Sequence, residues 1–172
     1  MTEDETIVYI ITTEKSPRTF DDYSNYFFLI APLGFVAIGC SALYNYFRFT
    51  SGLSILFFSI AFICSGILFS VFILTRLKDN ITFTSISPIS AESMDNVVEK
   101  LNQHFTLRRI DVDKKLGKIV AFTKITAFSW GEQITVIFDK DRILINSRPS
   151  GTRQPFTILK DRQNIKRLAE ML

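Results

Sequence analysis

The chain has 172 residues, of which 47% are hydrophobic, and a formal net charge of +3. Residues 76–172 suffice for one small domain, and the two cysteines, Cys40 and Cys64, are expected to pack as small apolar residues rather than form a disulfide, a metal site or a nucleophile. The charge is uneven: residues 1–22 carry two basic and six acidic groups, and residues 76–172 carry seventeen basic and eleven acidic ones. Residues 23–75 hold one charged residue, Arg48, so composition divides the chain into three parts.

The first part, residues 1–22, contains a run of β-branched and aromatic residues from Thr6 to Thr12, which has strand character. We expect a cytosolic segment that either adds an edge strand to the carboxy-terminal domain or stays an ordered free tail. The start of the chain, Thr2-Glu3-Asp4-Glu5, is acidic, whereas a signal peptide starts with basic residues. We therefore expect no cleaved leader, and neither end matches a lipidation motif.

The second part, residues 23–75, consists of two uncharged runs separated by Arg48. Each run exceeds the roughly 20 apolar residues that a helix needs to cross about 30 Å of hydrocarbon. We predict a transmembrane helical hairpin with helices over 26–47 and 53–75. We expect Gly52 to supply the left-handed backbone of a tight turn, and Pro32 to bend or thin the first span because it lacks a backbone donor.

Basic residues outside the two runs predict the orientation. Lys15, Arg18, Arg76 and Lys78 flank the side of the termini, whereas the loop side has only Arg48. Because cytoplasmic flanks are enriched in Lys and Arg, both termini are expected in the cytoplasm. The abundance of Phe, Ile, Lys and Asn is compatible with a bacterial inner membrane, which is the predicted location.

Small residues four positions apart occur in both runs, and such rows let helix backbones approach closely in lipid. Two interpretations stay open: the rows pack the two spans on each other, or they form a surface for another membrane subunit. The candidate residues are Ala37, Ser41, Ala61, Ser65, Gly66 and Ser70. Neither predicted span contains an ionisable side chain other than its tyrosines and cysteines, which argues against a transporter or pump.

The third part, residues 76–172, has mixed charge and alternating apolar residues. Predicted strands lie at 81–86, 107–112, 118–125, 133–138 and 143–148, with a weaker one at 155–159. Predicted helices run over about 90–105, capped by Ser90, and onward from Asp161. The fold class is therefore an α+β membrane protein, in which the hairpin precedes a β-α-β-β-β-β-α antiparallel sheet domain with helices on one face.

The most distinctive string of this domain is Ser129-Trp130-Gly131-Glu132, which holds the only tryptophan. It is either a recognition loop, with Trp130 as the aromatic anchor and Glu132 as its polar partner, or a bulged turn of structural importance. Glu132 has no second titratable group placed beside it by the sequence, so it is not predicted to act as a general acid or base.

Two basic clusters are candidates for contact with anionic lipid, which attracts each nearby Lys or Arg by about 1 kcal/mol. Ordinary solvated loops are the alternative interpretation. The candidate residues are Lys114, Lys115, Lys118, Arg148 and Arg153, the last two in a basic stretch at 148–153. No aromatic RNA-binding motif accompanies them, so no nucleic-acid partner is expected.

Motifs that carry chemistry are missing from the sequence. It has no Gly-rich phosphate loop, no metalloprotease motif and no cysteine pair in the domain, and its only histidine, His104, cannot form a metal site alone. We therefore expect no catalytic residue, no cofactor and no metal, and a protein that is not an enzyme.

These patterns favour a non-enzymatic, membrane-anchored accessory or scaffold subunit of a membrane protein assembly. Its expected partners are the bilayer and other membrane subunits or further copies of itself. The alternative is a lipid- or small-ligand-binding module at the inner leaflet, in which the sheet and a helix enclose an apolar pocket. A third hypothesis is a membrane-bound immunity or stress protein.

Overall fold

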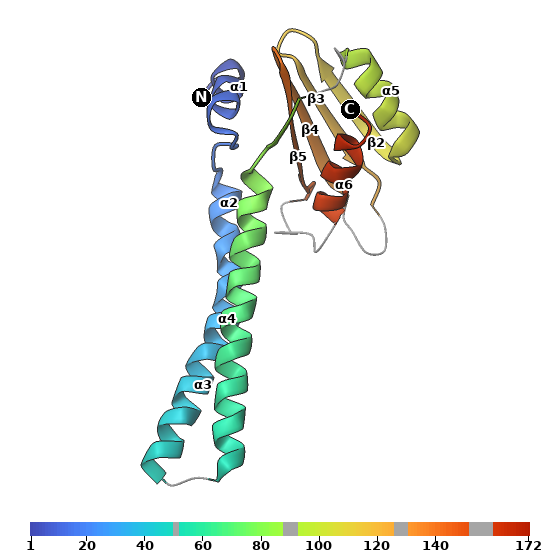
Figure 1. Cartoon of the computed structure of the whole chain (residues 1–172). Coiled ribbons are helices and arrows are strands. Elements are labelled where there is room, and N and C mark those ends of the chain that lie inside the picture. The colour runs from blue at the N-terminus through green and yellow to red at the C-terminus, as the bar shows by residue number, and fades with distance from the viewer. Residues whose placement is uncertain (50–51, 88–92, 126–130, 152–159) are drawn as a thin grey trace. The chain divides into compact units, whose positions relative to one another are not determined.

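The computed structural model describes residues 1–49, 52–87, 93–125, 131–151 and 160–172. The chain forms two compact units, one of residues 20–77 and one that joins residues 1–19 to residues 78–172 (Figure 1). We call them the helical unit and the α+β unit. The α+β unit is thus built from segments on both sides of the apolar runs.

The helical unit consists of two long arms. The first runs through α2 (Phe20–Ser24), the 3-10 turn η1 (Asn25–Leu29) and α3 (Ile30–Phe49), and the second is α4 (Leu53–Ile81), whose last turn belongs to the α+β unit. The arms, of 30 and 29 residues, are long and apolar enough to cross a membrane. The 3-10 turn lies just before Pro32, which has no N–H to bond a carbonyl of the preceding turn, so the irregularity falls where the sequence places it.

Two glycines carry the contact between α3 and α4. A Cβ on Gly39 would lie 2.7 Å from Cγ1 of Ile63 and 2.8 Å from the carbonyl oxygen of Ser59. A Cβ on Gly66 would lie 2.6 Å from the carbonyl oxygen of Pro32. These distances leave no room for a larger side chain, so the glycines set how closely the two backbones approach.

The loop end of the helical unit holds its charge among aromatic rings. Nη1 of Arg48 donates a 2.8 Å hydrogen bond to the hydroxyl of Tyr44, and the guanidinium lies over the rings of Tyr44 and Phe49. The expectation for Gly52 is wrong, because its φ lies outside the left-handed region. Gly52 instead directly precedes α4, and its carbonyl accepts from the N–H of Ile55.

The α+β unit contains a five-stranded antiparallel sheet in the order β1-β5-β4-β3-β2. Its strands are β1 (Thr84–Ile86), β2 (Leu107–Asp113), β3 (Lys118–Thr123), β4 (Glu132–Asp139) and β5 (Arg142–Pro149), and its later helices are α5 (Met94–His104) and α6 (Lys160–Ala169). The predicted β-α-β-β-β-β-α order is confirmed. β1 starts three residues later than predicted because α4 continues through Ile81, six residues beyond the predicted end of its span.

The predicted cap of the first domain helix, Ser90, lies outside the described residues, as does the weak strand at 155–159. The described cap of α5 is Ser93, whose side chain accepts from the N–H of Asn96 at 3.2 Å. Serine satisfies an amide that has no partner within the helix, so the type of cap agrees with the prediction and its position differs.

The amino-terminal segment is a helix, and the predicted edge strand is wrong. α1 (Glu3–Thr13) begins with a capping box, in which the Thr2 hydroxyl accepts from the Glu5 N–H and the Glu5 carboxylate accepts from the Thr2 N–H. Ile7 and Ile10, one helical turn apart, are buried together. Capping and burial of one face outweigh the strand propensity of the β-branched residues.

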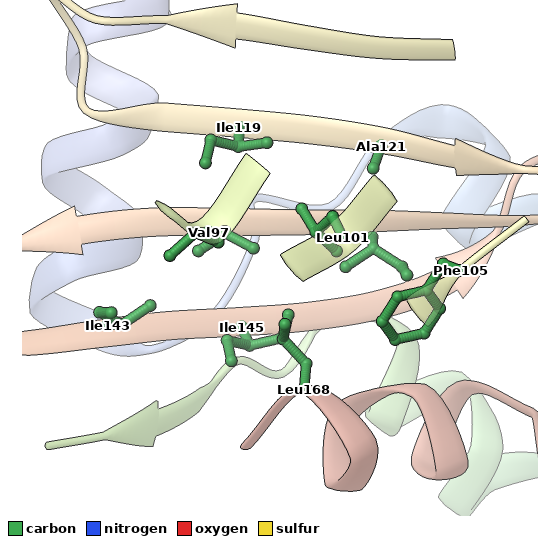
Figure 2. Packing of buried hydrophobic residues seen from close by; sticks show 10 residues of the cluster. Val97, Leu101, Phe105, Ile119, Ala121, Ile143, Ile145 and Leu168 are labelled. Atoms are coloured by element: carbon green, nitrogen blue, oxygen red, sulfur yellow. The ribbon is translucent and has the colours of Figure 1, made fainter. Parts of the chain in front are cut away.

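Helices cover both faces of the sheet, which corrects the expectation of one covered face. On one face, α5 and α6 bury a cluster with β3, β4 and β5; Figure 2 labels Val97, Leu101, Phe105, Ile119, Ala121, Ile143, Ile145 and Leu168. A second cluster joins Ile7 and Ile10 of α1 to Phe83, Ile137 and Leu144. Neighbouring residues of β5 enter different clusters because strand side chains alternate between faces.

Two substitutions within α1 test this packing. Ile10 is buried against the sheet, so Ile10→Ala is expected to lower the free energy of unfolding of the α+β unit by about 2 kcal/mol. Val8 lies exposed on the same helix, and Val8→Ala is expected to change that free energy by no more than about 0.5 kcal/mol. Urea denaturation of the full chain in a neutral detergent measures both, and equal effects would contradict the docking of α1.

Candidate functional site

The side-chain amide of Asn146, in β5, donates hydrogen bonds to backbone carbonyl oxygens at the carboxyl-terminal end of α4. Its Nδ2 atom lies 2.7 Å from the carbonyl oxygen of Thr82, 3.2 Å from that of Asn80 and 3.3 Å from that of Asp79. The last carbonyls of a helix have no intrahelical donor and need an outside one. Asn146 is 2% exposed, so these carbonyls are satisfied by a buried side chain of the sheet.

Beside Asn146, the sheet face that α1 partly covers has a hollow of about 160 Å³. The strand register places Gln133 opposite Arg148 and Thr135 opposite Asn146, so four polar side chains lie together on β4 and β5. The hollow is lined by Thr6, Ile10, Ser16, Phe83, Lys118, Val120, Gln133, Thr135, Asn146 and Arg148. It therefore combines an apolar border with a polar floor.

A second hollow of about 450 Å³ adjoins the first, because both are lined by Lys118, Val120 and Gln133. It extends across β2 to the edge of the sheet, where Arg109, Asp111 and Asp113 line it, and Glu3 of α1 borders it. We call the two hollows together the sheet groove. It gathers polar and charged side chains of α1 and of strands β2 to β5 on one face of the sheet.

Most charges of the sheet groove are paired. Nζ of Lys118 lies 2.6 Å from a carboxylate oxygen of Glu3, and Nε of Arg109 lies 2.8 Å from one of Asp111. Arg148 differs: its Nη2 donates a long 3.5 Å hydrogen bond to the amide oxygen of Gln133, and it forms no ion pair with the described residues. Arg148 is thus the cation of the groove that lacks a carboxylate among the residues described.

The structure brings together two of the predicted anionic-lipid residues and separates the others. Lys118 and Arg148 line the same hollow although β4 lies between their strands. Arg148 belongs to β5, not to a loop. Lys114 instead pairs with Asp95 of α5 at 3.0 Å. Lys115 is exposed in the turn before β3, and Arg153 lies outside the described residues.

The string around Trp130 is described only in part, because Trp130 lies outside the described residues. Gly131 has a φ of +89°, and a Cβ there would lie 2.7 Å from the carbonyl oxygen of Thr123. Glu132 is fully buried, and its N–H donates to the Thr123 hydroxyl at 2.8 Å. Gly131 and Glu132 therefore contact Thr123, the last residue of β3, in the interior of the α+β unit.

The small-residue candidates separate into two groups. Gly66 is buried against α3, and Ser70 is half-buried with its hydroxyl donating to the carbonyl oxygen of Gly66. The other four are exposed in the helical unit: Ala37, Ser41, Ala61 and Ser65. Packing of α3 on α4 thus accounts for one row, and the remaining rows lie on the outside.

A further hollow of about 320 Å³ lies beside α6 and includes Asp79, Ser147 and Arg162. Arg162 donates two hydrogen bonds to one carboxylate oxygen of Asp79, at 2.7 and 3.1 Å. The hydrogen bond and charge of Asp79 raise the pKa of Arg162 above its ordinary value, so this cation stays charged and paired. The Arg162 guanidinium of this hollow is thus already paired with a carboxylate, whereas the Arg148 guanidinium of the sheet groove has no carboxylate partner among the described residues.

The sheet groove was not predicted, although the sequence holds a signal for it. Polar residues occupy alternate positions of two strands, Gln133 and Thr135 in β4 and Asn146 and Arg148 in β5. Alternate residues share a face of a strand, so each pair was readable. Their combination depends on the register of β4 with β5.

Comparison with protein-family models, with curated proteins and with solved structures gives no match to this chain. Residues and geometry are therefore the basis for a functional proposal.

Removal of the Asn146 amide tests its role at the end of α4. Asn146→Ala removes the side-chain donor to the carbonyl oxygens of Asn80 and Thr82 and is expected to lower the free energy of unfolding by about 1–3 kcal/mol. Asn102 is exposed on α5, and Asn102→Ala serves as the control with little expected change. Hydrogen exchange should show faster exchange around 79–83 only in the first variant; unchanged protection there would sink the assignment.

Proposed function

We propose that this protein is a membrane-anchored accessory or scaffold subunit of a membrane protein assembly. Its two apolar helices cross a bilayer and carry no substrate. The α+β unit binds a partner protein in the cytoplasm. The proposal assigns it no catalytic role. The observation that carries the proposal is the make-up of the α+β unit, in which a helix that precedes both apolar arms packs on strands that follow them.

The contact of α1 with the sheet joins the two terminal segments by both apolar and polar interactions. Ile7 and Ile10 pack with Ile137 and Leu144. Arg142 of β5 donates to the carboxylate of Glu14 at 2.8 Å and to the carbonyl oxygen of Ile11 at 2.7 Å. Segments in such contact lie on the same side of any membrane, which requires an even number of crossings. Two spanning helices meet this requirement.

The basic flanks support a cytoplasmic position for the α+β unit. Lys15 and Arg18 precede the first arm, and Lys78 lies at the end of the second, whereas Arg48 is the basic residue at the loop end. This distribution is typical of proteins whose termini stay in the cytoplasm. We propose the bacterial inner membrane as the location.

The outward rows of the helical unit support assembly with another membrane subunit or a second copy. Gly39 and Gly66 carry the contact between α3 and α4, so the exposed Ala37, Ala61 and Ser65 are not needed for it. In lipid, helices associate through small residues that allow close backbone approach. We propose these rows as the partner surface of the anchor.

Cysteine labelling in membrane vesicles tests the topology. In a variant with Cys40 and Cys64 replaced by alanine, single cysteines are introduced as Val8→Cys, Lys115→Cys and Gly52→Cys. An impermeant maleimide applied from one side is expected to label positions 8 and 115 together, and position 52 only from the other side. Detergent-dissolved vesicles control for reactivity, and labelling of 8 and 115 from opposite sides would exclude the proposed anchor.

Crosslinking in the native membrane tests the partner surface. The double variant Ala61→Leu/Ser65→Leu fills an exposed row and is expected to reduce crosslinked partner about tenfold, which corresponds to about 1.4 kcal/mol. Ile67→Leu, an exposed position of the same helix, is the matched control and should leave the yield unchanged. A chain that stays monomeric in the native membrane, or equal yields in both variants, would refute the scaffold role.

A further inference from the structure

Arg148 occupies an unusual position for a cation. Its side chain is half-buried in the sheet groove, and the one hydrogen bond that it makes with described residues is the 3.5 Å bond to Gln133. A guanidinium has five N–H donors, and a charge withdrawn from water is costly without partners. The groove therefore presents a cation with unused donors.

The residues around Arg148 extend this donor set. Nε2 of Gln133 donates to the hydroxyl of Thr135 at 3.3 Å. Thr135 is only 7% exposed and lines the same hollow, and its hydroxyl, an acceptor in that bond, keeps its own proton to donate. Arg148, Gln133 and Thr135 thus form a connected polar row across β4 and β5.

Among the described residues, the smaller hollow of the groove is lined by two cations, Lys118 and Arg148, and by no carboxylate, whereas Asp113 lines the other hollow and accepts from the N–H groups of Lys115 and Leu116. Lys118 is compensated by Glu3, which leaves the charge of Arg148 in the smaller hollow. The hollow at Arg148 measures about 160 Å³, below the roughly 300–1,000 Å³ of pockets for drug-sized ligands. Its size and charge suit one compact anionic group.

We propose that the sheet groove binds a phosphate group, carried by a soluble phosphate ester or by a lipid headgroup, with Arg148 as its direct partner. Guanidinium binds phosphate through two parallel hydrogen bonds of matching geometry. Lys118 lies in the same hollow, where Glu3 competes with the ligand for its ammonium group. This inference adds a ligand site to the protein and does not depend on the scaffold role.

The test uses the full chain in a neutral detergent. Two soluble probes, inorganic phosphate and glycerol 3-phosphate, and one lipid probe, phosphatidic acid in mixed micelles with phosphatidylcholine as reference, are titrated while NMR follows the amides of Gln133 and Thr135. Saturable shifts are expected at these residues. Shifts with soluble probes identify a soluble ester as the source, and shifts with phosphatidic acid alone identify a lipid headgroup. No saturable shift with any probe overturns the proposal.

Variants connect the binding to Arg148. Arg148→Gln is expected to weaken it at least about tenfold, whereas Arg108→Gln removes an equal charge from an exposed position outside the groove and should change it less than about twofold. Equal losses in the two variants would overturn the assignment. Arg148→Lys keeps the charge without the paired geometry and is expected to bind with intermediate affinity, which provides the measurement if Arg148→Gln does not fold.

A substitution at Glu3 changes affinity in the opposite direction. Glu3→Gln releases the ammonium group of Lys118 from its 2.6 Å ion pair, so phosphate is expected to bind a few-fold more tightly. Weaker binding in this variant would show that Lys118 does not face the ligand and would overturn the placement of phosphate between β3 and β5.

Discussion

The alternation of side chains along β4 and β5 is the constraint on which the α+β unit depends. Ile134 and Val136 enter the cluster under α5 and α6, whereas Ile137 enters the cluster under α1. A shift of one residue in the pairing of these strands would exchange the two sets. Both faces of the sheet therefore need a helical cover, and the cover of the second face comes from a segment that lies before both apolar arms in the chain.

α1 covers only the apolar part of that second face. Basic residues of the sheet form ion pairs with acidic residues near both ends of α1. Lys118 pairs with Glu3 in its first turn, and Arg142 binds Glu14 and the carbonyl oxygen of Ile11 in its last turn. A cation at the carboxyl end of a helix also interacts favourably with the helix dipole. The polar part of the face stays outside this cover, and this division creates the sheet groove.

The sequence predicted the features that depend on local pattern. The two uncharged runs and the order of helices and strands along the chain were readable because composition and apolar periodicity are local. α1 was misread from its β-branched residues, although Thr2 and Glu5 stand at the spacing of a capping box and indicated a helix start. The meeting of Lys118 with Arg148 was beyond reach, because it depends on the pairing of three strands. The sequence also could not show which small residues face outward, since that depends on the contacts of Gly39 and Gly66.

The division of the α+β unit between the two ends of the chain has a consequence for biosynthesis. More than one hundred residues separate the end of α1 from the start of β4, so at roughly 5–20 residues per second α1 waits on the order of ten seconds for the strands that cover it. Both apolar helices emerge during this interval. If only one of them entered a bilayer, the membrane would separate α1 from its sheet and Ile7 and Ile10 would stay uncovered. An even number of crossings, none or two, would leave α1 on the side of its sheet, so burial of Ile7 and Ile10 would be lost only in a chain with a single inserted helix.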